Sequence, residues 1–184
     1  MKKQNISLVI LMMTVFGCTA VNAASVVVNG GTIHFTGDII DAACAVSVNS
    51  ENQTVKLGQY RTATFTAAGV TTTPIPFNIV LNECDPAVSS SASVAFNGQQ
   101  DLTDSTLLVV SSSGSNTTVA KGVGIEIKDR NFKVLPPDGT TYSTPHTLTK
   151  GVNTLLFTAN YKSTAASVTA GKADGNATFT INYQ

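Results

Sequence analysis

Two cysteines, Cys44 and Cys84, are the side chains in this sequence with the clearest capacity for covalent chemistry. Two cysteines in an exported chain most simply form a disulfide, and a zinc site would need more ligands than this pair supplies. The disulfide would close a loop of about 40 residues, which chain-entropy estimates equate with roughly 4 kcal/mol of stabilisation. The alternative is a pair of free thiols, which an oxidising compartment disfavours.

The other polar side chains give little support for catalysis. His34 lies in an alternating segment and is expected on the surface of a strand, whereas His146 follows a proline in an expected solvated loop. Asp101 and Asp104 could form paired carboxylates, but an aspartate in a turn more often accepts hydrogen bonds from its own backbone. No G-x-S-x-G, H-E-x-x-H or phosphate-loop motif occurs in the sequence. We therefore expect no enzyme activity, no catalytic residues, no cofactor and no metal.

The composition favours one folded domain. The chain has 184 residues, of which 42% are hydrophobic and 12% are charged, against about 25% charge in an average soluble protein. Low charge with ample apolar content excludes a disordered chain and is sufficient for a core. Eleven basic and eleven acidic residues give no net charge, so the electrostatic footprint of a nucleic-acid-binding protein is missing. We expect neither nucleic acid nor a small-molecule substrate as a partner.

The N-terminus is typical of a secretory signal peptide. Lys2 and Lys3 precede an apolar run at 6–16 that is too short to span a bilayer comfortably. Small residues before position 24 indicate cleavage after Ala23, so the expected signal peptide is 1–23 and we expect the chain to be exported. Residues 15–18 give a lipoprotein site at Cys18 as an alternative, which the bulky Phe16 fits badly.

Period-two alternation of apolar and polar residues predicts strands throughout the mature chain. Turn-forming residues separate the alternating segments at 97–98, 112–114, 136–139, 150–151 and 174–175. Many short strands with such punctuation indicate a single all-β sandwich or barrel. The predicted strands are 32–36, 54–57, 77–81, 93–96, 123–128, 155–161 and 177–183.

Both ends of the mature chain differ from an ordinary sandwich. Residues 24–42 are apolar and strand-like, yet glycines interrupt them, and glycine in a strand indicates close approach of another group. The last alternating strand ends at Gln184, with nothing after it to cover its edge. A spare strand and an open edge suggest head-to-tail strand addition between copies. Alternatively, residues 24–42 fold back onto their own domain or fray.

Several motifs carry a resemblance that spans nearly the whole mature chain. They are VNGGTIHF at 28–35, AACAV at 42–46, VKLGQYRT at 55–62, PFNIVLNEC at 76–84, and the end from 177 to 184. A glycine fourteen positions from the end, Gly171, and the penultimate Tyr183 complete the pattern. In this order and with this cysteine spacing, the sequence resembles the structural pilins of chaperone–usher fimbriae, and closely the major subunit of type 1 fimbriae.

The resemblance implies an incomplete immunoglobulin-like sandwich, residues 43–184, that lacks its final strand. A periplasmic chaperone would fill the gap first, and at an outer-membrane usher the extension 24–42 of another pilin would replace it. The result would be a fimbria on the bacterial surface that serves adhesion. The side chains implied to face the groove are Val27, Gly31, Ile33, Phe35, Gly37 and Ile39; those of the chaperone and acceptor-groove strand are Gly171, Phe179, Ile181, Tyr183 and Gln184.

Two alternatives to this implied role stay open. The chain could be a minor or adaptor pilin of the same fibre, which would have the same fold at a different position. It could also be a secreted β-sandwich that binds a sugar or protein ligand, although it lacks the separate lectin domain that an adhesin of this family adds.

Overall fold

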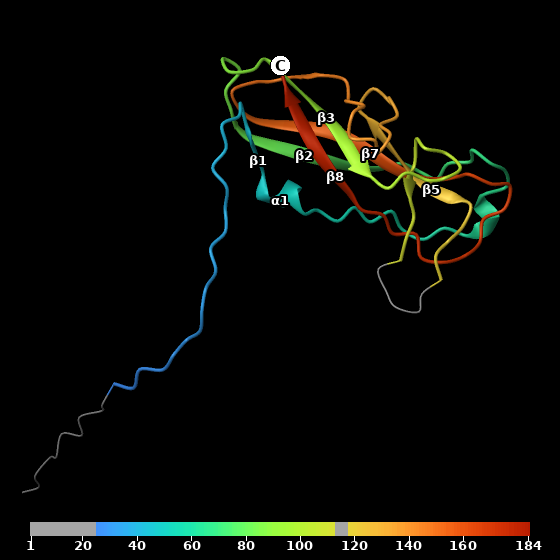
Figure 1. The fold of residues 1–184 in the computed structure, drawn as a ribbon, viewed down its shortest axis with the longest axis horizontal. Helices are drawn as coiled ribbons and strands as arrows, with labels where there is room; N and C mark the ends of the chain where they lie inside the picture. The colour runs from blue at the N-terminus through green and yellow to red at the C-terminus, as the bar shows by residue number, and fades with distance from the viewer. Residues whose placement is uncertain (1–24, 113–117) are drawn as a thin grey trace, which may run out of the picture. The chain divides into compact units, whose positions relative to one another are not determined.

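The computed structural model describes residues 25–112 and 118–184 of the chain (Figure 1). The predicted signal peptide at 1–23, Cys18 and most of the predicted turn at 112–114 lie outside the described residues. The chain divides into two units, residues 1–38 and residues 39–184. Within the described ranges, no helix is long and apolar enough to cross a membrane.

An antiparallel sheet of five strands forms one layer of the second unit, in the order β1–β2–β7–β5–β4. Its centre is the pair β2 (Ile75–Cys84) and β7 (Gly151–Ser163), and β5 (Val123–Asp129) pairs with the other edge of β7. The two-residue strands β1 (Ala45–Val46) and β4 (Leu108–Val109) occupy the ends of the sheet.

A sheet of three antiparallel strands forms the other layer, in the order β6–β3–β8. Its strands are β6 (His146–Thr147), β3 (Ser91–Gly98) and β8 (Ala177–Tyr183), and Figure 1 shows β3 and β8 side by side. A short helix, α1 (Val48–Glu51), and a 3-10 turn, η1 (Thr62–Thr64), lie between β1 and β2 in the sequence.

Because side chains alternate between the two faces of a strand, the apolar side chains of both sheets face each other and form one core. Three aromatic rings join the layers at its centre: Phe77 of β2, Phe96 of β3 and Phe157 of β7. Their ring centroids lie 5.3 to 6.1 Å apart. Buried aliphatic side chains surround them, namely Ile79, Leu81, Val94, Ile125, Ile127 and Leu155. The predicted all-β sandwich is therefore confirmed.

The strand predictions are confirmed at 77–81, 93–96, 123–128, 155–161 and 177–183 and are wrong for the single chain at 32–36 and 54–57. Residues 32–36 and 54–57 have the predicted alternation, but they form no ladder of main-chain hydrogen bonds with any strand that the structure describes. A strand exists only with a paired neighbour. His34 is exposed in irregular backbone for this reason. The loop expected at His146 is also wrong. This half-buried residue belongs to β6 and pairs with Ala92 of β3. Its Nδ1 atom lies 3.3 Å from Nη1 of Arg130.

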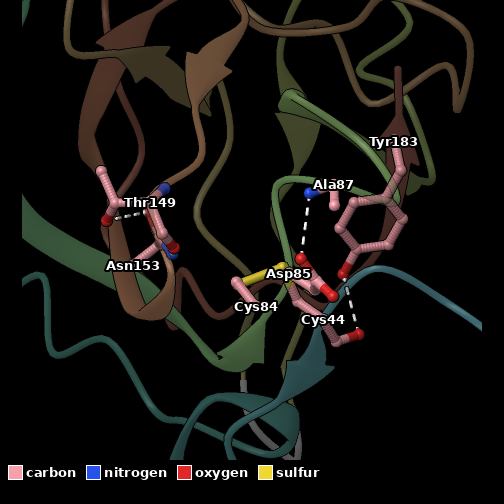
Figure 2. Close-up of a disulfide and its surroundings, with 7 residues drawn as sticks. All are labelled: Cys44, Cys84, Asp85, Ala87, Thr149, Asn153 and Tyr183. Atoms are coloured by element: carbon pink, nitrogen blue, oxygen red, sulfur yellow. Dashed lines mark hydrogen bonds between the residues drawn. A yellow bond between two sulfur atoms is a disulfide. The ribbon is translucent and has the colours of Figure 1, made fainter.

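The predicted disulfide between Cys44 and Cys84 is confirmed, and both cysteines are buried. It joins the residue before β1 to the last residue of β2, with 4.2 Å between the two Cα atoms. Figure 2 shows Tyr183 of β8 beside it, with its hydroxyl donating a hydrogen bond of 3.2 Å to the carbonyl oxygen of Cys44. The disulfide therefore lies at the start of the domain, where β1 and β2 of one sheet and the end of β8 of the other sheet come together.

We expect the double substitution Cys44→Ser and Cys84→Ser to lower the free energy of unfolding by roughly 4 kcal/mol, because the unfolded chain would lose its closed loop. The urea midpoint of the purified subunit measures this change. Reduction of the unmodified subunit should lower the midpoint equally. An unchanged midpoint in both samples would contradict the expectation.

Candidate functional site

The free edge of β8 is the first part of the candidate site. β8 pairs with β3 on one side, and no strand of the described residues pairs with its other side. Gln184 exchanges two main-chain hydrogen bonds with Ser91, of 3.0 and 2.9 Å. Bonded and non-bonded residues alternate along an antiparallel pair. Phe179, Ile181 and Tyr183 therefore direct their main-chain N–H and C=O groups toward the free edge.

A groove with an apolar floor runs beside this edge. One part has a volume of about 770 Å³ and lies between residues 50–58 and residues 173–177, with Phe179. A second part of about 610 Å³ lies between residues 58–62 and residues 168–174. The two parts form one continuous groove because they share four lining residues, namely Gly58, Tyr161, Ala173 and Asp174. We call this the acceptor groove.

The floor of the acceptor groove is the open side of the core. Core side chains from both sheets line it, namely Phe77, Ile79, Phe96, Ile125, Ile127 and Ala159. Charged residues such as Glu51, Lys56 and Asp174 belong to its walls. The groove thus presents apolar contacts below and unpaired main-chain groups at one side, which is the environment that an additional β-strand requires.

Tyr161 is the one hydroxyl-bearing aromatic residue that both parts of the groove share. Its hydroxyl donates a 2.8 Å hydrogen bond to the carbonyl oxygen of Ala173, and its ring packs edge-on against Tyr60. Burial, followed by the charge of Asp174, raises the pKa of Tyr161. The phenol therefore stays neutral and internally bonded, and the floor offers no ionised group to an occupant.

Gly171 shapes one wall of the second part of the groove. A Cβ at this position would overlap the backbone of Val119 and Ala120. The close approach is held by hydrogen bonds of 2.8 Å from Ala120 N–H to Lys172 and from Lys172 N–H to Thr118. Of the sequence-predicted acceptor residues, Gly171 thus lies outside β8, whereas Phe179, Ile181 and Tyr183 lie on it and Gln184 extends its pairing.

The N-terminal segment exposes its apolar side chains. Residues 25–41 contain no regular secondary structure, and bends follow only at residues 42–44. The side chains predicted to face a groove, those of Val27, Ile33, Phe35 and Ile39, are 77 to 103% exposed. A Cβ added at Gly31 or Gly37 would meet no atom within 4 Å. The single chain therefore provides no burial for these side chains.

Sequence reasoning missed residues 53–58 as a wall of the site. The alternation of Val55 and Leu57 was present in the sequence, and both side chains are half-buried and line the groove. The alternation indicated a strand, but it could not show that this segment lacks a neighbouring strand. The one sign in the sequence was that no partner strand could be identified for it.

Asp101 and Asp104, which could be mistaken for paired carboxylates, have separate hydrogen-bond partners. Asp101 accepts hydrogen bonds of 2.8 and 3.1 Å from the N–H groups of Thr103 and Asp104. Asp104 accepts from Thr106 and forms an ion pair of 3.1 Å with Lys162. The Thr106 hydroxyl is the main cause of a lowered Asp104 pKa. The prediction that these carboxylates bind their own turns is confirmed.

Comparison with known proteins identifies relatives of the whole chain. A family model described as fimbrial protein matches residues 33–184. The chain is 54% identical to fimbrial subunit type 1 of Salmonella typhimurium over 174 residues, 95% of this chain and 94% of that protein. It is 43% identical to the type-1 fimbrial protein A chain of Escherichia coli (strain K12) over 185 residues, 100% of each. A solved chaperone–usher pilus, studied for rod uncoiling, is 28% identical with a TM-score of 0.71, covering 88% of this chain and 100% of that chain.

We expect Gly171→Ala to destabilise the domain by about 1–3 kcal/mol, because the new methyl group forces two backbone segments apart. The urea midpoint and the yield of folded subunit measure the effect. Gly30→Ala is the matched control, since a Cβ there meets open space. Equal midpoints for the two variants would contradict this account of the groove wall.

Proposed function

The chain belongs to the fimbrial protein family and is a structural pilin subunit with an incomplete immunoglobulin-like sandwich, and we propose that it polymerises by donor-strand exchange. Residues 24–42 of one copy, which we call the donor segment, would fill the acceptor groove of another pilin. One observation supports this most: the same chain carries an unpaired β8 edge above an apolar groove and an exposed, alternating apolar segment. Fimbrial subunits form extracellular surface fibres, and the proposed role here is structural rather than catalytic.

The free energy available from this exchange is substantial. Burying Val27, Ile33, Phe35 and Ile39 at roughly 1.5–3 kcal/mol each gives about 6–12 kcal/mol. Main-chain hydrogen bonds to the free edge of β8 add about 1 kcal/mol each. The conformational entropy lost when the donor segment becomes ordered opposes this gain.

Alternation decides which face of the donor segment enters the groove. Odd-numbered positions carry Ile33, Phe35 and Ile39 together with Gly31 and Gly37, so we assign this face to the groove. Glycines on that face suit points where the groove approaches the donor backbone. The even-numbered face, with His34 and Thr36, would lie toward solvent.

Before a donor arrives, the subunit needs protection. An unpaired edge beside a groove with an apolar floor is a template for aggregation. We propose that a periplasmic chaperone lends a strand to β8 at Phe179, Ile181 and Tyr183 and holds the terminal carboxylate of Gln184. An outer-membrane usher would then be the place where the donor segment of another subunit replaces that strand. The signal peptide proposed at 1–23 would deliver the chain to this compartment.

We expect Phe35→Asp to block polymerisation, because it would bury an unpaired charge against the apolar groove at a cost of several kcal/mol. Gly37→Arg should do the same by collision. Assembly with chaperone and usher is measured as a ladder of polymers that resist mild heating in detergent.

His34→Asp and Thr36→Asp are the matched controls on the other face, and both should polymerise nearly as the unmodified chain does. Chaperone complexes of all four variants should form in normal amounts, because the donor segment takes no part in them. Equal ladders from variants of both faces would refute the proposal.

A second expectation follows from the hydrogen-bonding direction along β8. Ala177→Pro removes an N–H that points to the free edge and should leave the domain folded, while weakening docking of chaperone and donor by about 1 kcal/mol or more. Thr178→Pro removes an N–H that pairs with β3 and should instead destabilise the domain itself. Urea unfolding and chaperone co-purification separate the two effects. If Ala177→Pro copurified with chaperone as well as the unmodified chain, the free edge would not be the docking edge.

A further inference from the structure

Asparagine followed directly by glycine occurs at two places in the sequence, Asn29–Gly30 and Asn97–Gly98. Asparagine is one of the residues that proteins lose by spontaneous chemistry. It is most reactive before glycine, because the main-chain nitrogen of the glycine can approach the carbonyl carbon of the asparagine side chain. The first pair lies in the donor segment and the second lies in β3, so the same two residues occur in two very different backbones.

The backbone at Asn29–Gly30 is free to adopt the geometry that this reaction needs. Both residues are exposed and lie outside regular secondary structure. The N–H of Gly30 forms no hydrogen bond with any residue that the structure describes, and a Cβ added at Gly30 would meet no atom within 4 Å. Glycine itself has no side chain to restrict rotation about its backbone bonds. The nitrogen of Gly30 can therefore turn toward Cγ of Asn29.

A main-chain donor already contacts the carbonyl group that would be attacked. The N–H of Gly31 donates a hydrogen bond of 3.4 Å to Oδ1 of Asn29. Negative charge develops on this oxygen when a nucleophile adds to Cγ, and an N–H aimed at such an oxygen stabilises the transition state. Gly31 has a φ of 113°, a conformation that residues with a side chain rarely adopt. The segment thus supplies both a nucleophile and a donor for the Asn29 side chain.

The fold fixes the backbone of the second pair, Asn97–Gly98. Both residues belong to the ladder between β3 and β8, and the N–H of Gly98 donates a hydrogen bond of 3.1 Å to the carbonyl oxygen of Pro137. A Cβ at Gly98 would overlap the side chain of Leu108, so the chain has little space in which to rotate. Asn97 is exposed, as Asn29 is. Backbone freedom, and not the access of water, therefore distinguishes the two pairs.

We propose that Asn29 is a site of spontaneous deamidation in the unassembled subunit. The main-chain nitrogen of Gly30 gives its proton to solvent and bonds to Cγ of Asn29, while the bond from Cγ to the side-chain nitrogen breaks and ammonia leaves. The product is a cyclic imide. Water then opens the ring, either at Cγ to leave an aspartate or at the main-chain carbonyl carbon to leave an isoaspartate. One water is consumed and one ammonia is released, and nothing is oxidised or reduced.

Deamidation would impair the donor segment, and this consequence rests on the proposed function. Position 29 is odd-numbered, so it lies on the face assigned to the groove, together with Val27 and Gly31. A carboxylate there would direct a charge toward the apolar floor. An isoaspartate would lengthen the main chain after position 29, so that Val27 would lose its register with Ile33 and Phe35. A deamidated copy should therefore be a poor donor.

Assembly would protect the same site. In a donor strand the main chain around Gly30 would enter a hydrogen-bonded ladder, as the main chain around Gly98 does in the sandwich. The reactive geometry would then form only during local opening of that ladder. Deamidation would thus accumulate in copies that stay unassembled, and it would limit the time for which a free subunit can still act as a donor.

The test incubates the purified, unassembled subunit at mildly alkaline pH and follows both pairs by peptide mapping with mass spectrometry. Labelling with isoaspartyl methyltransferase identifies the isoaspartate product. We expect Asn29 to be converted at least about tenfold faster than Asn97, because only the first pair can reach the geometry of attack. Gly30→Ala, whose Cβ meets open space, should slow the conversion of Asn29 by about tenfold. Assembly into fibres should slow it by a similar factor.

The same incubated samples test the consequence for assembly. The unmodified subunit should lose its heat-resistant ladder in step with the conversion of Asn29, whereas Gly30→Ala should keep its ladder, since position 30 lies on the face away from the groove. Equal conversion of Asn29 and Asn97, equal conversion in fibres and free subunits, or a full ladder from converted subunits would overturn the inference. Absence of a ladder from fresh unmodified subunits would instead refute the donor-strand proposal, and the comparison of the two asparagines would still decide the reactivity of Asn29.

Discussion

A β-sheet satisfies its main-chain polar groups only where each strand has a neighbour, and among the described residues β8 has a neighbour on one side only. This constraint accounts for most of the molecule. The same strand supplies three half-buried apolar side chains to the core, so covering its free edge would complete the hydrogen-bond ladder and the hydrophobic core in one step. Because Phe77, Phe96 and Ile127 reach the acceptor groove from both sheets, the groove is a continuation of the core and not a separate surface feature.

The sequence pattern is enough to predict the all-β sandwich, because alternation at 77–81, 123–128 and 155–161 records which side chains face the core. It also indicates the two unusual ends of the chain. It does not predict where a strand is missing, because alternation at 54–57 looks the same whether or not a partner strand exists. The sequence also did not show why position 171 must be glycine. The reason is that the backbone at 119–120 lies directly against Gly171, and that segment is some 50 residues away in the sequence. The loop assigned to His146 failed because a two-residue strand leaves no measurable period.

The exposed apolar segment and the apolar groove are complementary within one chain, and the chain is a pilin by its family. Together they favour an assembly in which folding is finished between molecules.

The disulfide has a mechanical consequence in such a fibre. Tension would enter each subunit through the donor segment, which leads within two residues to Cys44. β1, the strand that follows, pairs with β2 over only two residues and would yield easily under load. The bond from Cys44 to Cys84 carries the force covalently past β1 to the end of β2, which pairs along most of its length with β7. Tyr183 attaches the end of β8 at the same point through its hydrogen bond to Cys44. The subunit would therefore transmit a pull through its two long central strands instead of peeling from its N-terminal end.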